Sequence, residues 1–145
     1  EGISFSDALD KCASEGGLLG LCGYNDLRDI QKGADNGDNR CQLALDVLAT
    51  TARDYLGAYV VEMGGLDVIS FTGGIGEKSS VVRSMILKEL EFLGIVMDSQ
   101  KNEITSGSGF LHTSTSKARL YVITTDEELV VARQTYNFLQ NLVRE

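Results

Sequence analysis

Residues 68–83 place a short β-branched and aromatic run directly before a glycine-rich turn and an amphipathic segment. The turn contains Gly73, Gly74 and Gly76, and the amphipathic segment begins near Glu77. A strand, a glycine turn and a helix in this order can bring ligand phosphates against backbone N–H groups and a helix N-terminus. The glycines permit close approach and positive φ, which a side chain would prevent. The segment therefore predicts a class of ligand, a nucleotide or other phosphate, without specifying a reaction.

Two common phosphate-binding motifs do not match these residues. The dinucleotide fingerprint requires a third glycine three positions after the second, but Gly76 is followed at that distance by Ser79. A Walker A loop requires glycine before the Lys-Ser pair, and Glu77 precedes Lys78 here. An ordinary tight strand-to-helix turn remains the structural alternative.

Composition limits the classes of protein to be considered. The chain has 145 residues, the size of one ordinary domain, and its 43% hydrophobic content is sufficient for a core. A net charge of −8 argues against nonspecific binding to nucleic acid or to an anionic membrane. No apolar run is long enough to span a bilayer. Three cysteines without CxxC spacing fit reduced thiols in a cytoplasmic protein.

Periodicity predicts alternating helices and strands, and therefore the α/β class. The continuous apolar run at 67–71 predicts a central strand covered on both faces. The first half of the chain is expected to form a short helix capped by Ser4 or Ser6 and ended by Gly16-Gly17, a short helix from Asn25, and a long helix that Asp38 or Asn39 starts, near Cys41 to Met63, with one broad buried face that includes Tyr55 and Tyr59. The second half is expected to form a helix from 77 to about 92, a short strand over 95–97, a polar loop over 99–109, a strand over 117–124, and a last helix capped by Thr125 or Asp126.

Three separated motifs then occur in a specific order and spacing. They are Gly17-Leu18-Leu19-Gly20-Leu21 with Asn25-Asp26-Leu27-Arg28-Asp29-Ile30, then Phe71-Thr72-Gly73-Gly74-Ile75-Gly76-Glu77, then Thr125-Asp126-Glu127-Glu128-Leu129 with Ala132-Arg133. Together they resemble the C-terminal part of the acetokinase family, which contains acetate, propionate and butyrate kinases. The similarity covers essentially the whole chain.

The resemblance implies an actin-like, ribonuclease-H-like α/β fold, with residues 1–145 as the second, C-terminal lobe and the N-terminal lobe absent. The family transfers the γ-phosphoryl group of ATP to a short-chain carboxylate such as acetate, reversibly, with ADP as product and Mg²⁺ as the divalent metal. It also implies a cytoplasmic homodimer with a dimer contact largely in this lobe. Neither nucleic acid nor membrane is expected as a partner.

The resemblance also assigns candidate site residues. The segment matching the family's adenosine contacts is Asp26, Leu27 and Arg28; the loop beneath adenosine and phosphates is Gly74, Ile75, Gly76, Glu77 and Lys78; and the glutamate associated with Mg²⁺ is Glu127. Each set has a structural alternative. Asp26 and Arg28 can form a helix cap and a surface ion pair, and Glu127 can interact with the dipole of its own helix.

The chain departs from the family pattern at two places. Lys78 stands where the family usually has asparagine, and could contact a phosphate or point to solvent. Asp126 ends a Thr-Thr-Asp run where the family usually has Pro-Thr-Asn. These departures keep open the alternative that the chain is a nucleotide-binding or dimerisation module without catalytic activity.

No catalytic residue is expected within these residues. The arginines, aspartate and histidine that hold the carboxylate and phosphoryl group are expected upstream of Glu1, so the chain alone is predicted to be inactive. His112 matches no family motif and is predicted to be structural or exposed. Which carboxylate is the acceptor stays open between acetate, propionate and butyrate.

Overall fold

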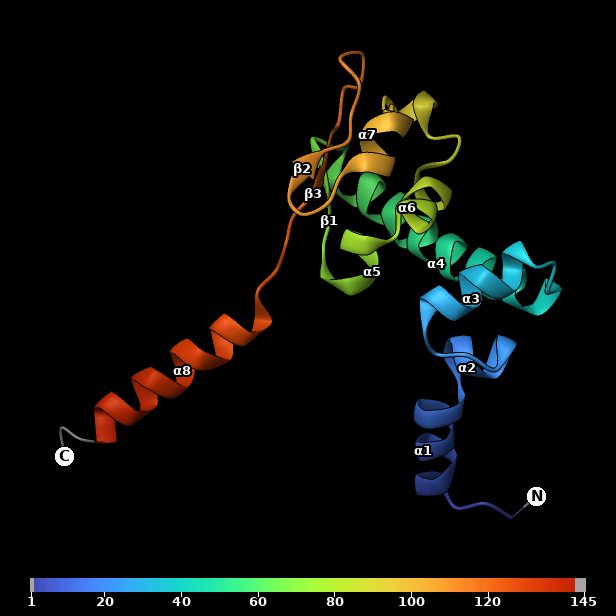
Figure 1. Cartoon of the computed structure of the whole chain (residues 1–145), viewed down its shortest axis with the longest axis vertical. Helices are drawn as coiled ribbons and strands as arrows, with labels where there is room; N and C mark the ends of the chain where they lie inside the picture. The colour runs from blue at the N-terminus through green and yellow to red at the C-terminus, as the bar shows by residue number, and fades with distance from the viewer. Residues whose placement is uncertain (1, 143–145) are drawn as a thin grey trace.

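The computed structural model describes residues 2–142 and combines eight α-helices with a small sheet (Figure 1). In chain order the elements are α1 (Phe5–Glu15), α2 (Gly17–Cys22), α3 (Leu27–Asp35), α4 (Asn39–Met63), β1 (Val68–Phe71), α5 (Gly73–Lys78), α6 (Ser80–Leu87), a 3₁₀ turn (Glu91–Leu93), α7 (Ser99–Ile104), β2 (Gly109–Phe110), β3 (Arg119–Val122) and α8 (Glu127–Leu142).

The sheet has the strand order β1-β3-β2. β1 and β3 are parallel, with Phe71 opposite Val122, whereas β2 pairs antiparallel with β3. The chain between the two parallel strands passes through α5, α6 and α7. β1 is therefore an edge strand and Val68 is 49% exposed, so the prediction of a central strand covered on both faces is wrong. The apolar run indicated burial, but within residues 2–142 the strand order leaves one edge of β1 without a neighbouring strand.

Two apolar clusters hold the body together. One lies against the sheet, where Ile95, Leu111 and Leu120 are almost completely buried. The other joins α2, α3, α4 and α6, with Ile30 and Cys41 among its buried members. Burial of apolar surface is the main favourable contribution to folding, so these clusters fix α3 and α6 relative to α4.

The long helix α4 starts and stops where its sequence predicts. The Asp38 carboxylate caps it by accepting a hydrogen bond of 2.8 Å from the N–H of Arg40, and Gly64 ends it with φ of 70°. Its buried face is shorter than expected, because it covers only the first half of the helix. Tyr55 and Tyr59, predicted to be in the core, are exposed and stack on each other.

Three local predictions between the first and last strands are wrong. The helix expected to run to about residue 92 is divided at Ser79, whose extended backbone separates α5 from α6. The expected polar loop contains α7, because the Asp98 carboxylate accepts from the N–H of Lys101 and caps a helix. The strand expected over 95–97 is reduced to a single bridge between Met97 and His112.

The first and last helices extend away from the body (Figure 1). α1 begins as predicted, with the Ser4 hydroxyl as its N-cap, but has no buried residue. α8 projects from the sheet end of the body and its described side chains are all exposed, including Leu129 and Phe138. None of the helices within residues 2–142 is both long and apolar enough to cross a lipid bilayer.

Candidate functional site

The glycine-rich segment after β1 is itself a helix. α5 occupies Gly73–Lys78, and two of its glycines have identifiable structural reasons. Gly73 has φ of 70°, a conformation that strains other residues. A Cβ on Gly76 would lie only 3.3 Å from the carbonyl carbon of Phe71, so the missing side chain lets α5 fold back against β1. The close approach at Gly76 is therefore to the chain's own backbone.

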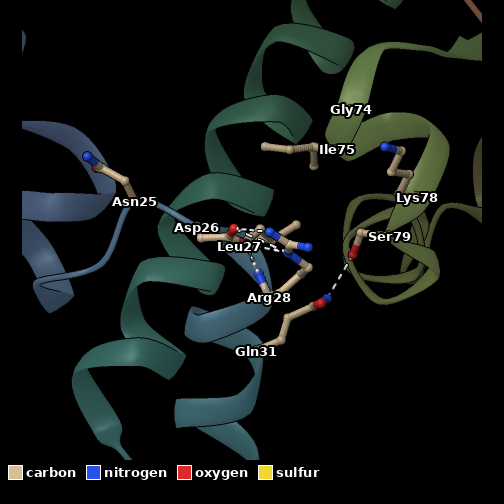
Figure 2. Close-up of a pocket in the computed structure, with 9 residues that line it drawn as sticks. All are labelled: Asn25, Asp26, Leu27, Arg28, Gln31, Gly74, Ile75, Lys78 and Ser79. Atoms are coloured by element: carbon tan, nitrogen blue, oxygen red, sulfur yellow. Dashed lines mark hydrogen bonds and ion pairs between the residues drawn. The ribbon is translucent and has the colours of Figure 1, made fainter.

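A cavity of about 420 Å³ lies between the start of α3 and α5 (Figure 2). It brings together two segments that sequence reasoning assigned to one ligand although they are far apart in the chain. The lining residues are Asn25, Asp26, Leu27, Arg28, Gln31, Gly74, Ile75, Lys78 and Ser79. Six of the eight predicted nucleotide-binding residues are among them, whereas Gly76 and Glu77 are not.

Asp26 and Arg28 interact with each other at the edge of this cavity. The Asp26 carboxylate caps α3, accepting a 2.8 Å bond from the backbone N–H of Arg28 and a 3.0 Å bond from its Nε. The Arg28 side-chain hydrogen bond, with help from the backbone bond, lowers the pKa of Asp26 to about 2. The helix cap and the surface ion pair, which are the structural alternative to ligand binding, are thus both present. The Arg28 guanidinium is still available to a ligand, because the Arg28 side chain is 88% exposed.

Gln31 and Ser79 extend the cavity beyond the predicted residues. Gln31 Nε2 donates a 2.8 Å bond to Ser79 Oγ (Figure 2). Ser79 Oγ also accepts from the N–H of Val82 at the start of α6. Gln31 follows Arg28 by three positions and so shares its face of the helix, a signal that periodicity could have supplied. Nothing local indicates Ser79, because its partner is 48 positions away.

A second cavity of about 470 Å³ lies between the same short helix and the segment that leads into α8. It contains the predicted metal-side residue, Glu127, together with Glu77, Thr125 and Asp126. Gly74 and Lys78 line both cavities, so α5 is shared between them. One ligand of sufficient length could therefore contact both.

Glu77 joins α5 to the segment that leads into α8. Its Oε1 accepts bonds of 2.9 Å and 3.1 Å from the backbone N–H and the hydroxyl of Thr125. The backbone bond is the main reason that the pKa of Glu77 is lowered. Two positions later Glu127 begins α8, after Asp126 caps the helix by accepting from the N–H of Leu129. Glu77 thus positions the neighbourhood of Glu127.

Among the described residues, the carboxylates near Glu127 could supply some of the ligands of a hard cation, but not a complete set. Within residues 2–142 no group of three or more His, Cys, Asp or Glu side chains is arranged to hold a metal by itself. Mg²⁺ commonly binds through one or two carboxylates together with substrate phosphates and water, so the donor set around Glu127 fits that mode.

His112 lines neither of these two cavities. Its ring lies near Phe110 and Tyr121, and Nδ1 is 3.2 Å from the backbone nitrogen of Leu120. A ring held by aromatic neighbours and a strand N–H has a packing role, as predicted. Of the cysteines, Cys12 is exposed and the other two are buried free thiols.

The sequence profile of the acetokinase family matches residues 1–133. The chain belongs to the acetokinase family. Its relatives include the acetate kinase of Carboxydothermus hydrogenoformans, 41% identical over 97% of this chain and 35% of that protein. The acetate kinase of Staphylococcus haemolyticus is 45% identical over 94% of this chain and 35% of that protein. The chain spans about a third of the length of these curated relatives.

Solved structures of acetokinase-family proteins share the fold. Porphyromonas gingivalis acetate kinase superposes with a TM-score of 0.85 and 36% identity, covering 95% of this chain and 35% of that one. A propionate kinase from Francisella tularensis superposes with a TM-score of 0.81 and 34% identity, covering 90% of this chain and 33% of that one. The predicted α/β, actin-like fold and the predicted family are confirmed.

Proposed function

We propose that this chain is the C-terminal, nucleotide-binding lobe of an acetate kinase, with an N-terminal lobe outside these 145 residues. The reaction is reversible transfer of the γ-phosphoryl group of ATP to acetate, giving acetyl phosphate and ADP. The observation that carries the proposal is identity of 41–45% to acetate kinases along nearly the whole chain. The cavity between α3 and α5 supports it, because the segments that match the family's adenosine contacts and loop lie together there.

The proposed binding roles follow from position in the two cavities. Arg28 offers an exposed guanidinium that can stack on a purine, beside Leu27 and Ile75. Lys78 lines both cavities and, in place of the usual asparagine, can contact phosphate oxygens. We assign Gly76 and Glu77 to shaping the loop, since the first lies against Phe71 and the second is bonded to Thr125.

Glu127 is the proposed metal-side residue. When bound, Mg²⁺ would neutralise charge that develops on the transferring phosphoryl group. Glu127 would interact with the cation from the first turn of α8, and Glu77 would keep that turn near α5. The acceptor clamp and other catalytic residues would come from the missing lobe, so this chain alone is expected to be inactive.

The proposal includes a cytoplasmic homodimer without nucleic acid or membrane partners. The net charge of −8 disfavours contact with polyanions. An apolar hollow of about 330 Å³ between α2 and α4, lined mainly by Leu18, Leu21, Leu48 and Tyr55, supports a protein contact in this lobe. Sedimentation equilibrium of the full-length protein tests this part, and a monomer at micromolar concentration would contradict it.

Turnover of the full-length protein tests the activity. Acetyl phosphate formation from ATP and acetate is expected, with lower kcat/KM for propionate and butyrate. The propionate kinase among the structural neighbours makes propionate the second candidate, and a higher kcat/KM with propionate would establish it instead. No turnover with any of the three acids would favour a non-catalytic nucleotide-binding or dimerisation module.

Substitutions test the two site assignments. Arg28→Ala is expected to weaken ATP binding by about twofold to fivefold, the range for one exposed cation–π contact. Arg119→Ala is the control, because Arg119 is an exposed arginine that lines neither cavity. Glu127→Gln is expected to raise the Mg²⁺ concentration needed for half-maximal turnover, whereas the acetate KM stays constant. Equal ATP affinity in both arginine variants would refute the role of Arg28.

A further inference from the structure

Arg83, on α6, is the largest side chain in the described part of the protein that is almost completely removed from solvent, with 1% exposure. Its guanidinium makes four hydrogen bonds within the protein. Nε donates to Asn102 Oδ1 at 2.7 Å, and Nη2 donates to the Asn102 carbonyl at 2.8 Å. Nη1 donates at 2.9 Å to the carbonyls of both Gly76 and Glu77. Among residues 2–142 no carboxylate forms an ion pair with it.

Packing alone does not account for an arginine at this position. Removing a charged group from water is costly, and an apolar side chain of similar volume could occupy the same space without that cost. The fork of N–H donors, in contrast, can orient several oxygens at once. The geometry therefore indicates that the position of the carbonyl groups is what Arg83 controls.

The carbonyls of Gly76 and Glu77 belong to the last turn of α5, the helix shared by the two cavities. α5 has only six residues and three are glycine, so it has little tendency to stay helical by itself. Its final carbonyls lack partners within the helix, and a cation at this end also interacts favourably with the helix dipole. Arg83 supplies both the donors and the charge.

Asn102 extends the same network to a third helix. Its Nδ2 donates to the Ser80 carbonyl at 2.8 Å and to Ser84 Oγ at 2.9 Å, while its oxygens accept from Arg83. Asn102 is itself 2% exposed and lies on α7. The arginine–asparagine pair thus joins α5, α6 and α7 at one buried point.

We propose that Arg83 is a positioning residue for the nucleotide. By holding the end of α5 it sets where Gly74 and Lys78 stand in the cavities, and through Glu77 it sets the distance to the start of α8. Arg83 touches no ligand itself, and it does not line either cavity. This inference rests on the proposed function, since it concerns the site in which the nucleotide would bind.

The test compares Arg83→Met with Arg53→Met in the full-length enzyme. Arg53 provides a matched control because its Nη1 also donates to two carbonyls, those of Met85 and Lys88, at a place away from both cavities. Steady-state kinetics are measured at a temperature where both variants are folded by circular dichroism. Arg83→Met is expected to raise the KM for ATP by about tenfold, since small displacements of positioning groups have large effects, and to leave the KM for acetate within about twofold.

Arg83→Lys separates charge from geometry. Lysine retains the charge without the planar fork, so it is expected to restore only part of the ATP affinity. Arg53→Met is expected to leave both KM values unchanged. If Arg83→Met does not fold, Asn102→Ala takes its place. It removes the Oδ1 acceptor of Arg83 and the Nδ2 bonds to Ser80 and Ser84, but it leaves the bonds from Arg83 to the backbone carbonyls. A smaller rise in the KM for ATP, with acetate unaffected, is then expected.

The outcomes distinguish the two proposals. An active enzyme whose KM for ATP is unchanged in the folded Arg83 or Asn102 variant overturns the positioning role and leaves the proposed function intact. Equal rises in both KM values, or the same change in Arg53→Met, also overturn it, because a general loss of structure would explain them. A wild-type protein that turns over none of acetate, propionate and butyrate refutes the proposed function, and with it this inference, which rests on that function.

Discussion

Gly33→Ala tests how closely the site-bearing helix α3 must approach α4. A Cβ on Gly33 would lie 2.5 Å from Cys41 Sγ and 3.2 Å from its Cβ. Cys41 is completely buried, so its thiol has little room to move. Overpacking of this kind costs about 1–3 kcal/mol, and replacing a helical glycine by alanine returns up to about 1 kcal/mol. The expected net change is a loss of about 1 kcal/mol in the free energy of unfolding.

The same substitution in a Cys41→Ala background has a different expected sign. Without the sulfur, the closest overlap disappears and the helical preference of alanine is what remains. Gly33→Ala is then expected to be neutral or stabilising by up to about 1 kcal/mol, so the coupling between the two sites is about 1–2 kcal/mol. The cost of truncating Cys41 occurs on both sides of the comparison and cancels.

Urea denaturation of the four proteins in this double-mutant cycle measures the coupling. Coincident transitions by fluorescence and circular dichroism would justify a two-state analysis. Additivity within about 0.5 kcal/mol would refute the reasoning, because contacting residues should not behave as independent sites. A stabilising Gly33→Ala in the wild-type background would refute it as well, since α3 and α4 would then tolerate a wider separation.

Three further predictions use other parts of the chain. Cys12 alone among the three cysteines is expected to react with a thiol reagent in the native protein at neutral pH, and all three in denaturant; rapid native labelling of more than one would contradict the burial seen here. Because the Thr125 N–H lowers the pKa of the Glu77 carboxyl from its ordinary 4.5, the ionised form is favoured by folding. Its contribution to stability is present above pH 4.5 and is lost as the pH falls through the lower folded value, so the pH dependence of unfolding below 4.5 should be shallower in Glu77→Gln. Leu120→Ala, in the core against the sheet, should cost about 2–5 kcal/mol, whereas Arg119→Ala next to it should change stability by less than about 0.5 kcal/mol; similar values from thermal denaturation would contradict the assigned faces of β3.

Much of the local structure could be predicted because its signals lie within a few residues. Asp38 and Gly64 delimit α4 by side-chain capping and by a left-handed terminal glycine, and both effects act within one turn. The cap of α7 is equally local. Asp98 accepts a hydrogen bond from the N–H of Lys101 within one turn, although the polarity and glycines of this stretch favour a loop.

Most residues of the candidate site could be predicted from the sequence, but only part of their arrangement could. The motif resemblance selected Asp26, Arg28 and Lys78, and the structure places all three around one cavity. The spacing of Asp26 and Arg28 also predicted the helix cap and the ion pair that they form with each other. The resemblance did not indicate Gln31, whose place in the cavity depends on the packing of α3 beside α5 and α6.

The sequence by itself determined the helix boundaries that caps define, the α/β class and the family, because each depends on local chemistry or on motif order. Only the tertiary structure decided that β1 is an edge strand, that Glu77 reaches Thr125 rather than the first cavity, and that Arg83 is buried against the carbonyls of α5. These features depend on which elements become neighbours after the chain folds. A strand's neighbours and a buried cation's acceptors come from residues far along the chain, and no local pattern encodes the distance between them.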